Sequence, residues 1–237
     1  MRSHNRATFF DYAKAVAIAE GREACALLHV VKGREMLFTC RNLSEDRHAF
    51  IIDPRDYAEA ERLGEIVAVI HSHVLRSPAP SEADRVSCEA SGLPWHIVSV
   101  PNGTWETLEP SGYKAPLIGR EFSHGVLDCY ALVRDYYKEN LGADLPEFER
   151  RPEWWSKGDR LLVPKNFRVA GFRAVTLDEI ATHDVLVMQI LADVPNHVGV
   201  YLGDDVFLHH LSGRLSSRDL FAGYYRKHCV QVLRFDP

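Results

Sequence analysis

The chain has 237 residues, of which 46% are hydrophobic and 26% are charged, and its formal net charge at neutral pH is −5. This length suffices for two domains of about 100 to 120 residues each, and the ordinary apolar content excludes wholesale disorder. The negative charge argues against a nucleic-acid partner, and no apolar run is long enough to span a membrane. Five cysteines without close spacing do not indicate a disulfide framework, so we expect synthesis in a reducing cytoplasm.

The first half of the sequence alternates between predicted helices and strands. Residues 7–20 are expected to form an amphipathic helix whose inward side chains are Phe9, Phe10, Ala13, Ala17 and Ile18. The segment 44–64 is interpreted as a strand followed by a helix that begins at Asp53-Pro54. Further strands are predicted over 24–31, 34–42, 65–73 and 95–101, with a helix over 82–90. Alternation of this kind predicts a mixed α/β domain over residues 1–108.

The second half of the sequence has a different order of elements. Residues 107–119 contain two prolines and two glycines and little periodicity, so we place a linker at 109–118. A strong helix is predicted over 128–142, and short strands are predicted over 184–190, 197–203, 206–211 and 229–235. One helix followed by antiparallel strands predicts an α+β domain over residues 119–237.

Two histidines end the predicted strand "EIVAVIHSH". Residues two apart on a strand share a face, so His71 and His73 point the same way and form half of a zinc site. Asp84 can supply a third ligand and leave the fourth position open. The alternative is that the histidines are surface residues and that Ser81 and Asp84 only form a capping box at a helix start.

The spacing His71-x-His73, seven residues, then Ser81-x-x-Asp84 resembles the signature of the JAMM metallopeptidases, also called MPN-plus domains. The resemblance implies a Zn²⁺ ion held by His71, His73 and Asp84. It also implies that Glu23 is the general base and that Ser81 stabilises the oxyanion. Two positions depart from the usual pattern, Val74 in place of a proline and Ala26 in place of a glycine.

A second group of reactive side chains begins at Cys129, in the first turn of the predicted helix 128–142. The positive helix end favours a thiolate there, although Cys129 also fits the inward stripe of an amphipathic helix. Candidate partners are His197 and His209 on successive strands. A regular two-residue turn at Asp204-Asp205 would place the two rings on opposite faces, so we predict a bulge or an odd-numbered loop in this hairpin.

The pattern Gly125-x-x-Asp128-Cys129 followed by "HVGVYLG" and His209 resembles the NlpC family of cell-wall cysteine peptidases, which has a papain-like fold. The resemblance covers about the last 120 residues. It implies Cys129 as nucleophile, His197 as general base and acid, and His209 as the residue that orients His197. The backbone N–H of Cys129 is expected to contribute to an oxyanion hole. His210, the neighbour of His209, is expected to point to the other face.

A JAMM-like domain followed by an NlpC-like domain resembles the tail assembly proteins of siphophages. This implies a tail tip component that contacts other phage tail tip proteins and hydrolyses peptidoglycan stem peptides, typically between γ-D-glutamate and a diamino acid. It is expected in the host cytoplasm during synthesis and in the virion tail tip afterwards. Two alternatives remain open: a structural or chaperone-like tail component with decayed sites, and a cellular JAMM deconjugating isopeptidase.

Overall fold

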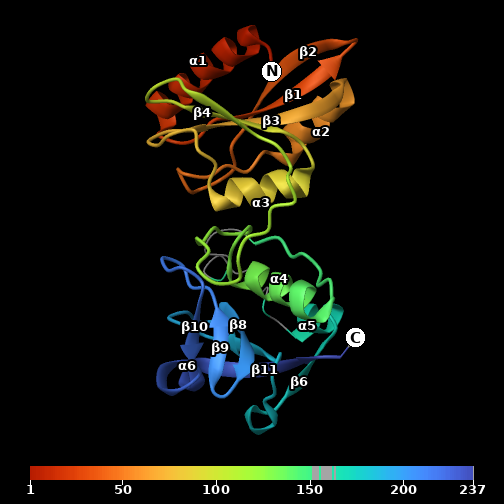
Figure 1. The fold of residues 1–237 in the computed structure, drawn as a ribbon, viewed down its shortest axis with the longest axis vertical. Helices are drawn as coiled ribbons and strands as arrows, with labels where there is room; N and C mark the ends of the chain where they lie inside the picture. Colours follow the sequence, from red (N-terminus) through yellow and green to blue (C-terminus); the bar gives the residue numbers. More distant parts are fainter. Residues whose placement is uncertain (151–154, 156–161, 163, 237) are drawn as a thin grey trace. The chain divides into compact units, whose positions relative to one another are not determined.

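The computed structural model describes residues 1–150, 155, 162 and 164–236. The chain divides into two compact units, Met1–Lys114 and Ala115–Pro237, and each unit is described by itself (Figure 1). The division falls inside the predicted linker 109–118. Within the described residues, no helix combines the length and apolarity needed to cross a membrane.

The first unit contains a five-stranded sheet with the order β2-β1-β3-β4-β5. β3 and β4 run parallel, and the other neighbouring pairs are antiparallel. Its elements are, in chain order, α1 (Ser3–Glu20), β1 (Cys25–Val31), β2 (Arg34–Cys40), α2 (Pro54–Leu63), β3 (Glu65–His73), α3 (Glu82–Ser91), β4 (Trp95–Ser99) and β5 (Trp105–Leu108). The mixed α/β class predicted for this half is confirmed.

The two faces of this sheet are covered by different helices. Phe9 and Ala13 of α1 pack against Ala26, Leu28 and their even-numbered neighbours on one face. Cys25, Leu27 and Val69 face the other side, where Ala60 of α2 and Cys88 of α3 join a second buried cluster. Since residues two apart on a strand share a face, His71 and His73 of β3 point to the same side as Val69, which is the side of α3.

Two details of the predicted first half are wrong. Ile18 is 87% exposed, because a helix turns about 100° per residue and therefore places Ile18 opposite the buried Phe9. The strand expected before Asp53 is reduced to one isolated bridge between Asn42 and Ile52. Side chains replace the strand pairing there, since the Asn42 amide accepts from the backbone N–H groups of Ser44 and Ile51.

The second unit contains a six-stranded antiparallel sheet with the order β10-β9-β8-β7-β11-β6. Its elements are, in chain order, α4 (Cys129–Leu141), α5 (Pro164–Val169), β6 (Phe172–Val175), η1 (Leu177–Glu179), β7 (Val185–Met188), β8 (His197–Gly203), β9 (Val206–His209), β10 (Ser217–Leu220), α6 (Gly223–His228) and β11 (Cys229–Phe235). The α+β class predicted for this half is confirmed. The short strands β6 and β10 were not predicted.

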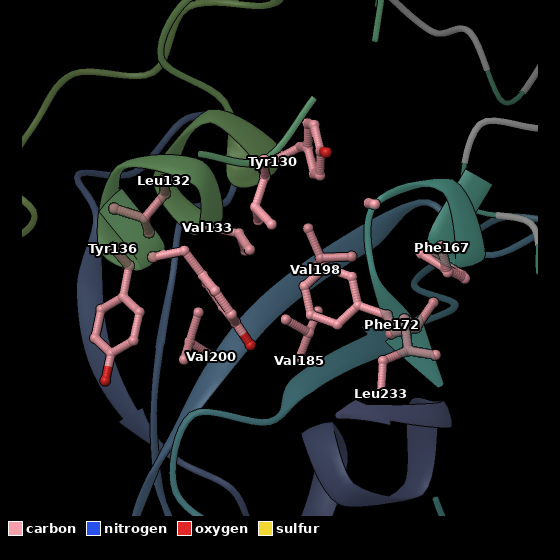
Figure 2. Close-up of a cluster of buried hydrophobic side chains, with 14 of the residues drawn as sticks. Tyr130, Leu132, Val133, Tyr136, Phe167, Phe172, Val185, Val198, Val200 and Leu233 are labelled. Carbon is pink, nitrogen blue, oxygen red and sulfur yellow. The ribbon is translucent and has the colours of Figure 1, made fainter. Parts of the chain in front are cut away.

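The helix α4 lies on one face of this sheet (Figure 2). Leu132, Val133 and Tyr136 of the helix pack against Val198 and Val200 of β8. Asp128 is the N-cap and accepts a 2.9 Å hydrogen bond from the N–H of Ala131, so Cys129 is the first residue of the helix. The helix therefore holds the thiol at its N-terminal end, beside the start of β8.

Candidate functional sites

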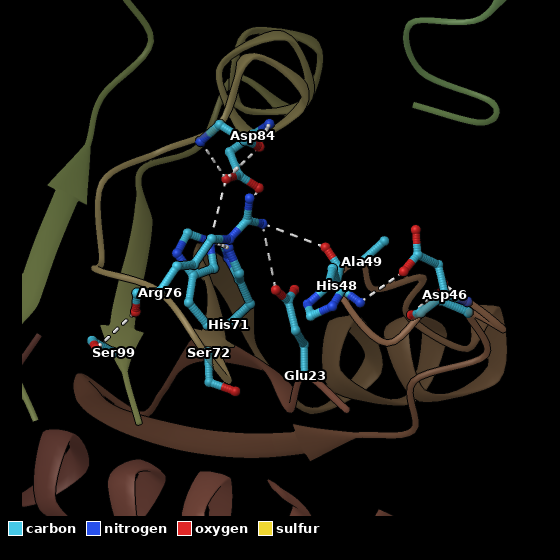
Figure 3. Close-up of polar contacts among 12 residues, drawn as sticks. Glu23, Asp46, His48, Ala49, His71, Ser72, Arg76, Asp84 and Ser99 are labelled. Carbon is cyan, nitrogen blue, oxygen red and sulfur yellow. Dashed lines mark hydrogen bonds and ion pairs between the residues drawn. The ribbon is translucent and has the colours of Figure 1, made fainter. Parts of the chain in front are cut away.

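The side chains of His71, His73 and Asp84 converge in the first unit. Figure 3 shows His71 and Asp84 of this group. The Nε2 atoms of the two histidines lie 3.2 Å apart, and Asp84 carboxylate oxygens lie 3.4 Å from His71 Nε2 and 3.5 Å from His73 Nε2. Both rings are fully buried. Asp84 belongs to the first turn of α3, so the end of a strand and the start of a helix bring the three groups together.

These separations fit a tetrahedral zinc ion. Zinc bonds of about 2.0–2.1 Å to nitrogen and oxygen place neighbouring ligand atoms about 3.3–3.4 Å apart. The three distances of 3.2, 3.4 and 3.5 Å lie close to that value. Burial lowers the pKa of His71 to about 4, so its ring is neutral at neutral pH, as a metal ligand must be.

The surroundings of the rings also suit a metal. His73 Nδ1 lies 2.6 Å from the carbonyl oxygen of Ser77, so Nδ1 carries the proton and Nε2 offers a lone pair. The His71 ring stacks on Phe50 with a centroid distance of 4.6 Å, which fixes its plane. Although burial opposes it, the His71 and His73 rings and Ser81 lower the pKa of Asp84, so this carboxyl is ionised at neutral pH.

Glu23 lies beside this cluster but is paired with a cation. Continuation of the β1–β3 register places Glu23 across from His73. Its Oε1 atom lies 3.6 Å from Nη2 of Arg76, whose side chain extends between Asp84 and Glu23 in Figure 3. Burial raises the pKa of Glu23 to about 8, although Arg76 acts in the opposite direction. No motif in the sequence pointed to Arg76.

Ser81 has a structural role in this geometry. Its hydroxyl donates to Asp84 Oδ2 at 2.7 Å, and its oxygen accepts from the N–H of Asp84 at 3.1 Å. The Ser81 N–H donates to the same carboxylate, which completes a capping box at the start of α3. The capping box was the alternative to a catalytic Ser81, and its geometry is compatible with both roles.

In the second unit, Asp128 anchors the turn that precedes Cys129. Its carboxylate accepts from the N–H of Gly125 at 3.0 Å and from Nε of Arg150 at 2.6 Å. Gly125 has φ +74°, and a Cβ atom there would lie 3.1 Å from the carbonyl oxygen of Arg150. The motif Gly125-x-x-Asp128-Cys129 thus specifies a tight loop that leads into the helix.

The Cys129 thiol is protonated at neutral pH. Burial and the nearby Asp128 carboxylate raise its pKa to about 12, although the backbone N–H groups of Val198 and Tyr130 act in the opposite direction. Burial and the Asp128 carboxylate thus act against the thiolate that the helix end was expected to favour. A nucleophile at this position requires a base that removes its proton.

Cys129 and His197 line the same cavity, which has a volume of about 280 Å³. Its other walls are mainly apolar and include Phe148 and Leu211, while the buried Asp128–Arg150 pair supplies charge. No hydrogen bond joins the thiol to His197 within the described part of the chain. His210, expected on the other face, also lines this cavity.

His197 and His209 are in contact. His197 Nε2 lies 3.0 Å from His209 Nδ1, and both rings are buried. Strand β9 pairs His209 with Gly199, which shares a face with His197, because the register shifts between Tyr201 and Gly203. The predicted bulge in this hairpin is confirmed. Burial lowers the pKa of His197 to about 3, so its ring is neutral at neutral pH and can accept a proton.

Asp219 extends this line of groups by one residue, and the sequence analysis missed it. Its Oδ2 lies 3.0 Å from His209 Nε2, on the side of the ring away from His197. Asp219 lies on β10, a four-residue strand in which the half-buried Ser217 and Asp219 alternate with the exposed Arg218 and Leu220. The alternation of "SRDL" is a weak strand signal, and only the pairing of β10 with β9 brings Asp219 to His209.

Two sequence families match the two units. Residues 119–234 match the pattern of the NlpC/P60 family, and residues 9–109 match the pattern of prokaryotic homologs of the JAB domain. Among solved structures, the NlpC/p60 domain of the peptidoglycan hydrolase SagA is 15% identical with a TM-score of 0.36. That comparison covers 50% of this chain and 90% of the SagA domain.

Two phage proteins resemble the chain over most of its length. The chain is 38% identical to tail tip assembly protein K of Escherichia phage N15, over 95% of this chain and 93% of that protein. It is also 38% identical to tail tip assembly protein K of Escherichia phage lambda, over 77% of this chain and 88% of that protein. The two family patterns together show that the chain combines a JAB-like unit and an NlpC/P60 unit.

Proposed function

Because this chain belongs to the family of phage tail tip assembly protein K, we propose that it is a tail tip peptidase that hydrolyses peptidoglycan stem peptides. One observation carries the proposal: a neutral His197, held by His209, shares a cavity with the protonated thiol of Cys129. A thiol of this kind becomes a nucleophile when a neutral imidazole takes its proton. We expect other tail tip proteins as partners and the virion tail as the final location.

In the proposed reaction, Cys129 Sγ forms a bond to the carbonyl carbon of the scissile peptide, and His197 accepts the thiol proton. The backbone N–H of Cys129 donates to the resulting oxyanion. His197 then gives the proton to the leaving amine as the C–N bond breaks, and water hydrolyses the thioester with His197 again as base. The bond between γ-D-glutamate and a diamino acid is the proposed target, with the apolar cavity receiving part of the stem peptide.

In the first unit, His71, His73 and Asp84 are the proposed ligands of one zinc ion. Bound zinc would polarise a peptide carbonyl and make a water molecule more acidic. Glu23 is the proposed proton acceptor, and it can serve only when its carboxyl is ionised, which burial opposes and Arg76 favours. A role for Ser81 at an oxyanion requires its hydroxyl to turn away from Asp84.

A structural role is a second candidate for the first unit, and the contact between Arg76 and Glu23 favours it. A guanidinium 3.6 Å from the proposed base offers that base a partner other than a reacting water. The alternative of a cellular deconjugating isopeptidase is less well supported, because it gives no role to Cys129, His197 and His209. The relatives at 38% identity are also phage tail tip proteins.

Digestion of purified peptidoglycan tests the proposal. The full chain is incubated with sacculi, and the released fragments are identified by mass spectrometry. We expect cleaved stem peptides with the wild type and none with Cys129→Ala. Cys229→Ala is the matched control, since Cys229 is a half-buried free cysteine at the start of β11 and its loss should leave cleavage unchanged. If the wild type releases no fragments, the structural role replaces the peptidase, and if wild type and Cys129→Ala release the same fragments, Cys129 is not the nucleophile.

A further inference from the structure

Asp219 approaches His209 from a neighbouring strand. In the β9–β10 register, Asp219 pairs with Phe207 and Ser217 pairs with His209, so Asp219 and His209 are diagonal neighbours on one face. The Asp219 Oδ2 atom lies 3.0 Å from His209 Nε2. His209 Nδ1 in turn lies 3.0 Å from His197 Nε2. Three side chains from three adjacent strands therefore form a line that ends at the cavity of Cys129.

The groups around Asp219 are hydrogen-bond donors. Arg214 Nη2 lies 3.2 Å from Oδ2, the Tyr225 hydroxyl lies 3.3 Å from the same atom, and the Ser217 hydroxyl lies 3.4 Å from Oδ1. Burial works against ionisation, but the hydrogen bond from His209 and the charge of Arg214 lower the pKa of Asp219. Asp219 is therefore a carboxylate at neutral pH, and a carboxylate can only accept hydrogen bonds.

Because the Asp219 carboxylate can only accept hydrogen bonds, it determines which nitrogen carries the proton in His209 and in His197. Because Asp219 can only accept, His209 Nε2 must donate, and the neutral His209 ring is left with Nδ1 as an acceptor. His197 Nε2 must then donate to His209 Nδ1, so the neutral His197 ring keeps Nδ1 as its free acceptor. We propose that Asp219 is a positioning residue that, through His209, holds His197 in the tautomer whose Nδ1 takes the proton of Cys129. This proposal rests on the peptidase function proposed above.

Aromatic packing prevents the His209 ring from flipping, so its Nδ1 and Nε2 atoms cannot exchange their partners. The Phe207 ring lies 4.3 Å from the His209 ring at an angle of 32°, and the Tyr225 ring contacts its edge region at 5.0 Å and 78°. A ring held on two sides cannot easily exchange Nδ1 and Nε2. The charged and titratable groups that face His209 are His197, Asp219, Arg214 and Tyr225. Asp219 is the only anion among these four groups.

The opposite tautomer would stop the proposed reaction. If His197 carried its proton on Nδ1, that nitrogen would donate and could not accept the thiol proton. The Asp219 charge also stabilises the positive charge that the ring pair acquires after proton transfer. Loss of Asp219 is therefore expected to lower kcat about tenfold to a hundredfold, the range typical for a residue that orients a functional side chain.

The first test reads the tautomers directly and does not depend on activity. Long-range proton–nitrogen NMR spectra of the ¹⁵N-histidine-labelled full chain are recorded at pH 7, with His197 and His209 assigned through His197→Gln and His209→Gln. We expect the proton on Nε2 of both rings in the wild type. In Asp219→Asn we expect a mixed population, and in Asp219→Glu a return to the wild-type pattern. A wild-type His209 with its proton on Nδ1 overturns the proposal, whether or not the protein cleaves peptidoglycan.

The second test is the pH dependence of kcat. Removal of the Asp219 charge lowers the pKa of the ring pair, so the acid limb of kcat in Asp219→Asn should move to lower pH while kcat falls. Asp219→Glu should restore the wild-type limb. Asp204→Asn is the matched control, because it removes the same charge at an exposed turn of the β8–β9 hairpin and should change neither quantity. If Asp219→Asn loses activity through misfolding alone, the limb stays in place, and that result overturns the proposal while the peptidase function stands.

Discussion

The two candidate sites are built from similar local elements but are organised differently. In each, a histidine at the end or start of a strand lies near the first turn of a helix, β3 with α3 and β8 with α4. In the first unit, three ligand atoms converge within 4.8 Å of one another. In the second unit, Asp219, His209 and His197 form a line in which each group contacts only the next.

This difference separates two kinds of chemistry. Convergence of neutral imidazoles and a carboxylate around one point suits a divalent cation, whose charge holds the cluster together. A line of groups suits directed proton transfer, because each hydrogen bond determines which nitrogen of the next ring is free. The comparison shows that histidine rings suit metal binding where their nitrogens face one common point. They suit proton transfer where each ring nitrogen faces a different partner.

The largest expected effect comes from breaking the line at His197. His197→Ala removes the proposed base, so kcat/KM should fall about 10³-fold to 10⁴-fold, with the protonated Cys129 thiol left unable to react. Peptide release from peptidoglycan, followed by mass spectrometry, measures this. His228→Ala is the control, since His228 lies at the end of α6. Full activity of His197→Ala would contradict the line as a functional unit.

The convergent cluster is tested by removing one of its three members. His71→Ala should weaken zinc binding at least about a hundredfold, because the remaining pair cannot complete the ligand set. Competition with a chromophoric chelator gives the affinity, and added zinc should raise the Tm of the wild type but not of the variant. His4→Ala, at an exposed position of α1, is the control. Equal zinc affinity of His71→Ala and wild type excludes this site.

The pH dependence of alkylation distinguishes a protonated thiol from a preformed ion pair. The pKa of Cys129 is about 12, so the thiolate fraction should rise about tenfold per pH unit between pH 7 and pH 9. The rate of iodoacetamide modification at Cys129, followed by peptide mapping, should rise in the same way. In the unfolded chain the rate should level off above the ordinary pKa. A folded-state rate that is already constant at pH 7 would show a thiolate.

The spacing between the two rings of the line depends on Gly199. A Cβ atom at this position would lie 2.8 Å from the Leu208 carbonyl oxygen and 3.0 Å from the His209 Cβ. Gly199→Ala should therefore displace β9, lower the free energy of unfolding by about 1–3 kcal/mol and reduce kcat. Val200→Ala, which faces the α4 core instead, should lower stability by about 2 kcal/mol and leave kcat unchanged. Equal kcat in both variants would mean that the ring spacing is unimportant.

The smallest expected effect is that of Ser81→Ala, which distinguishes the helix-capping role of Ser81 from a role at an oxyanion. Ser81→Ala removes the helix cap and should lower the free energy of unfolding of the first unit by about 1 kcal/mol. Zinc affinity should change little, since the backbone N–H of residue 81 still donates to the Asp84 carboxylate at 2.7 Å. Thermal unfolding and zinc titration measure both quantities. If Ser81 also acts on an oxyanion, any metal-dependent hydrolysis will fall by more than this loss of stability explains.

The geometry of the first candidate site could be predicted from the sequence more fully than that of the second. His71 and His73 lie on one strand, so alternation alone places both rings on the same side, and Asp84 follows at a spacing that a helix start explains. His197 and His209 lie on different strands, and their contact depends on a one-residue bulge. No residue pattern indicates that bulge. It could be predicted only because His197 and His209 must lie on the same face of the sheet if they are to act together.

The missed features depend on tertiary contacts. Asp219 lies on β10, which becomes recognisable only through its pairing with β9. Arg76 lies in the loop between His73 and Ser81, and nothing in the local sequence indicates that it reaches Glu23. The pKa of Cys129 is raised, whereas the helix end predicted a lower one; the inward stripe of the helix indicated the burial, but not the nearby Asp128 carboxylate that also raises the pKa.

The central claim is that hydrolysis in the second unit depends on its own line of groups and not on a metal. The direct measurement is the initial rate of stem-peptide release by the full chain before and after extraction of bound metal with a chelator. We predict an unchanged rate for the wild type and no release by Cys129→Ala in either state. A rate that disappears with the metal and returns with added zinc, in wild type and Cys129→Ala alike, would contradict the account.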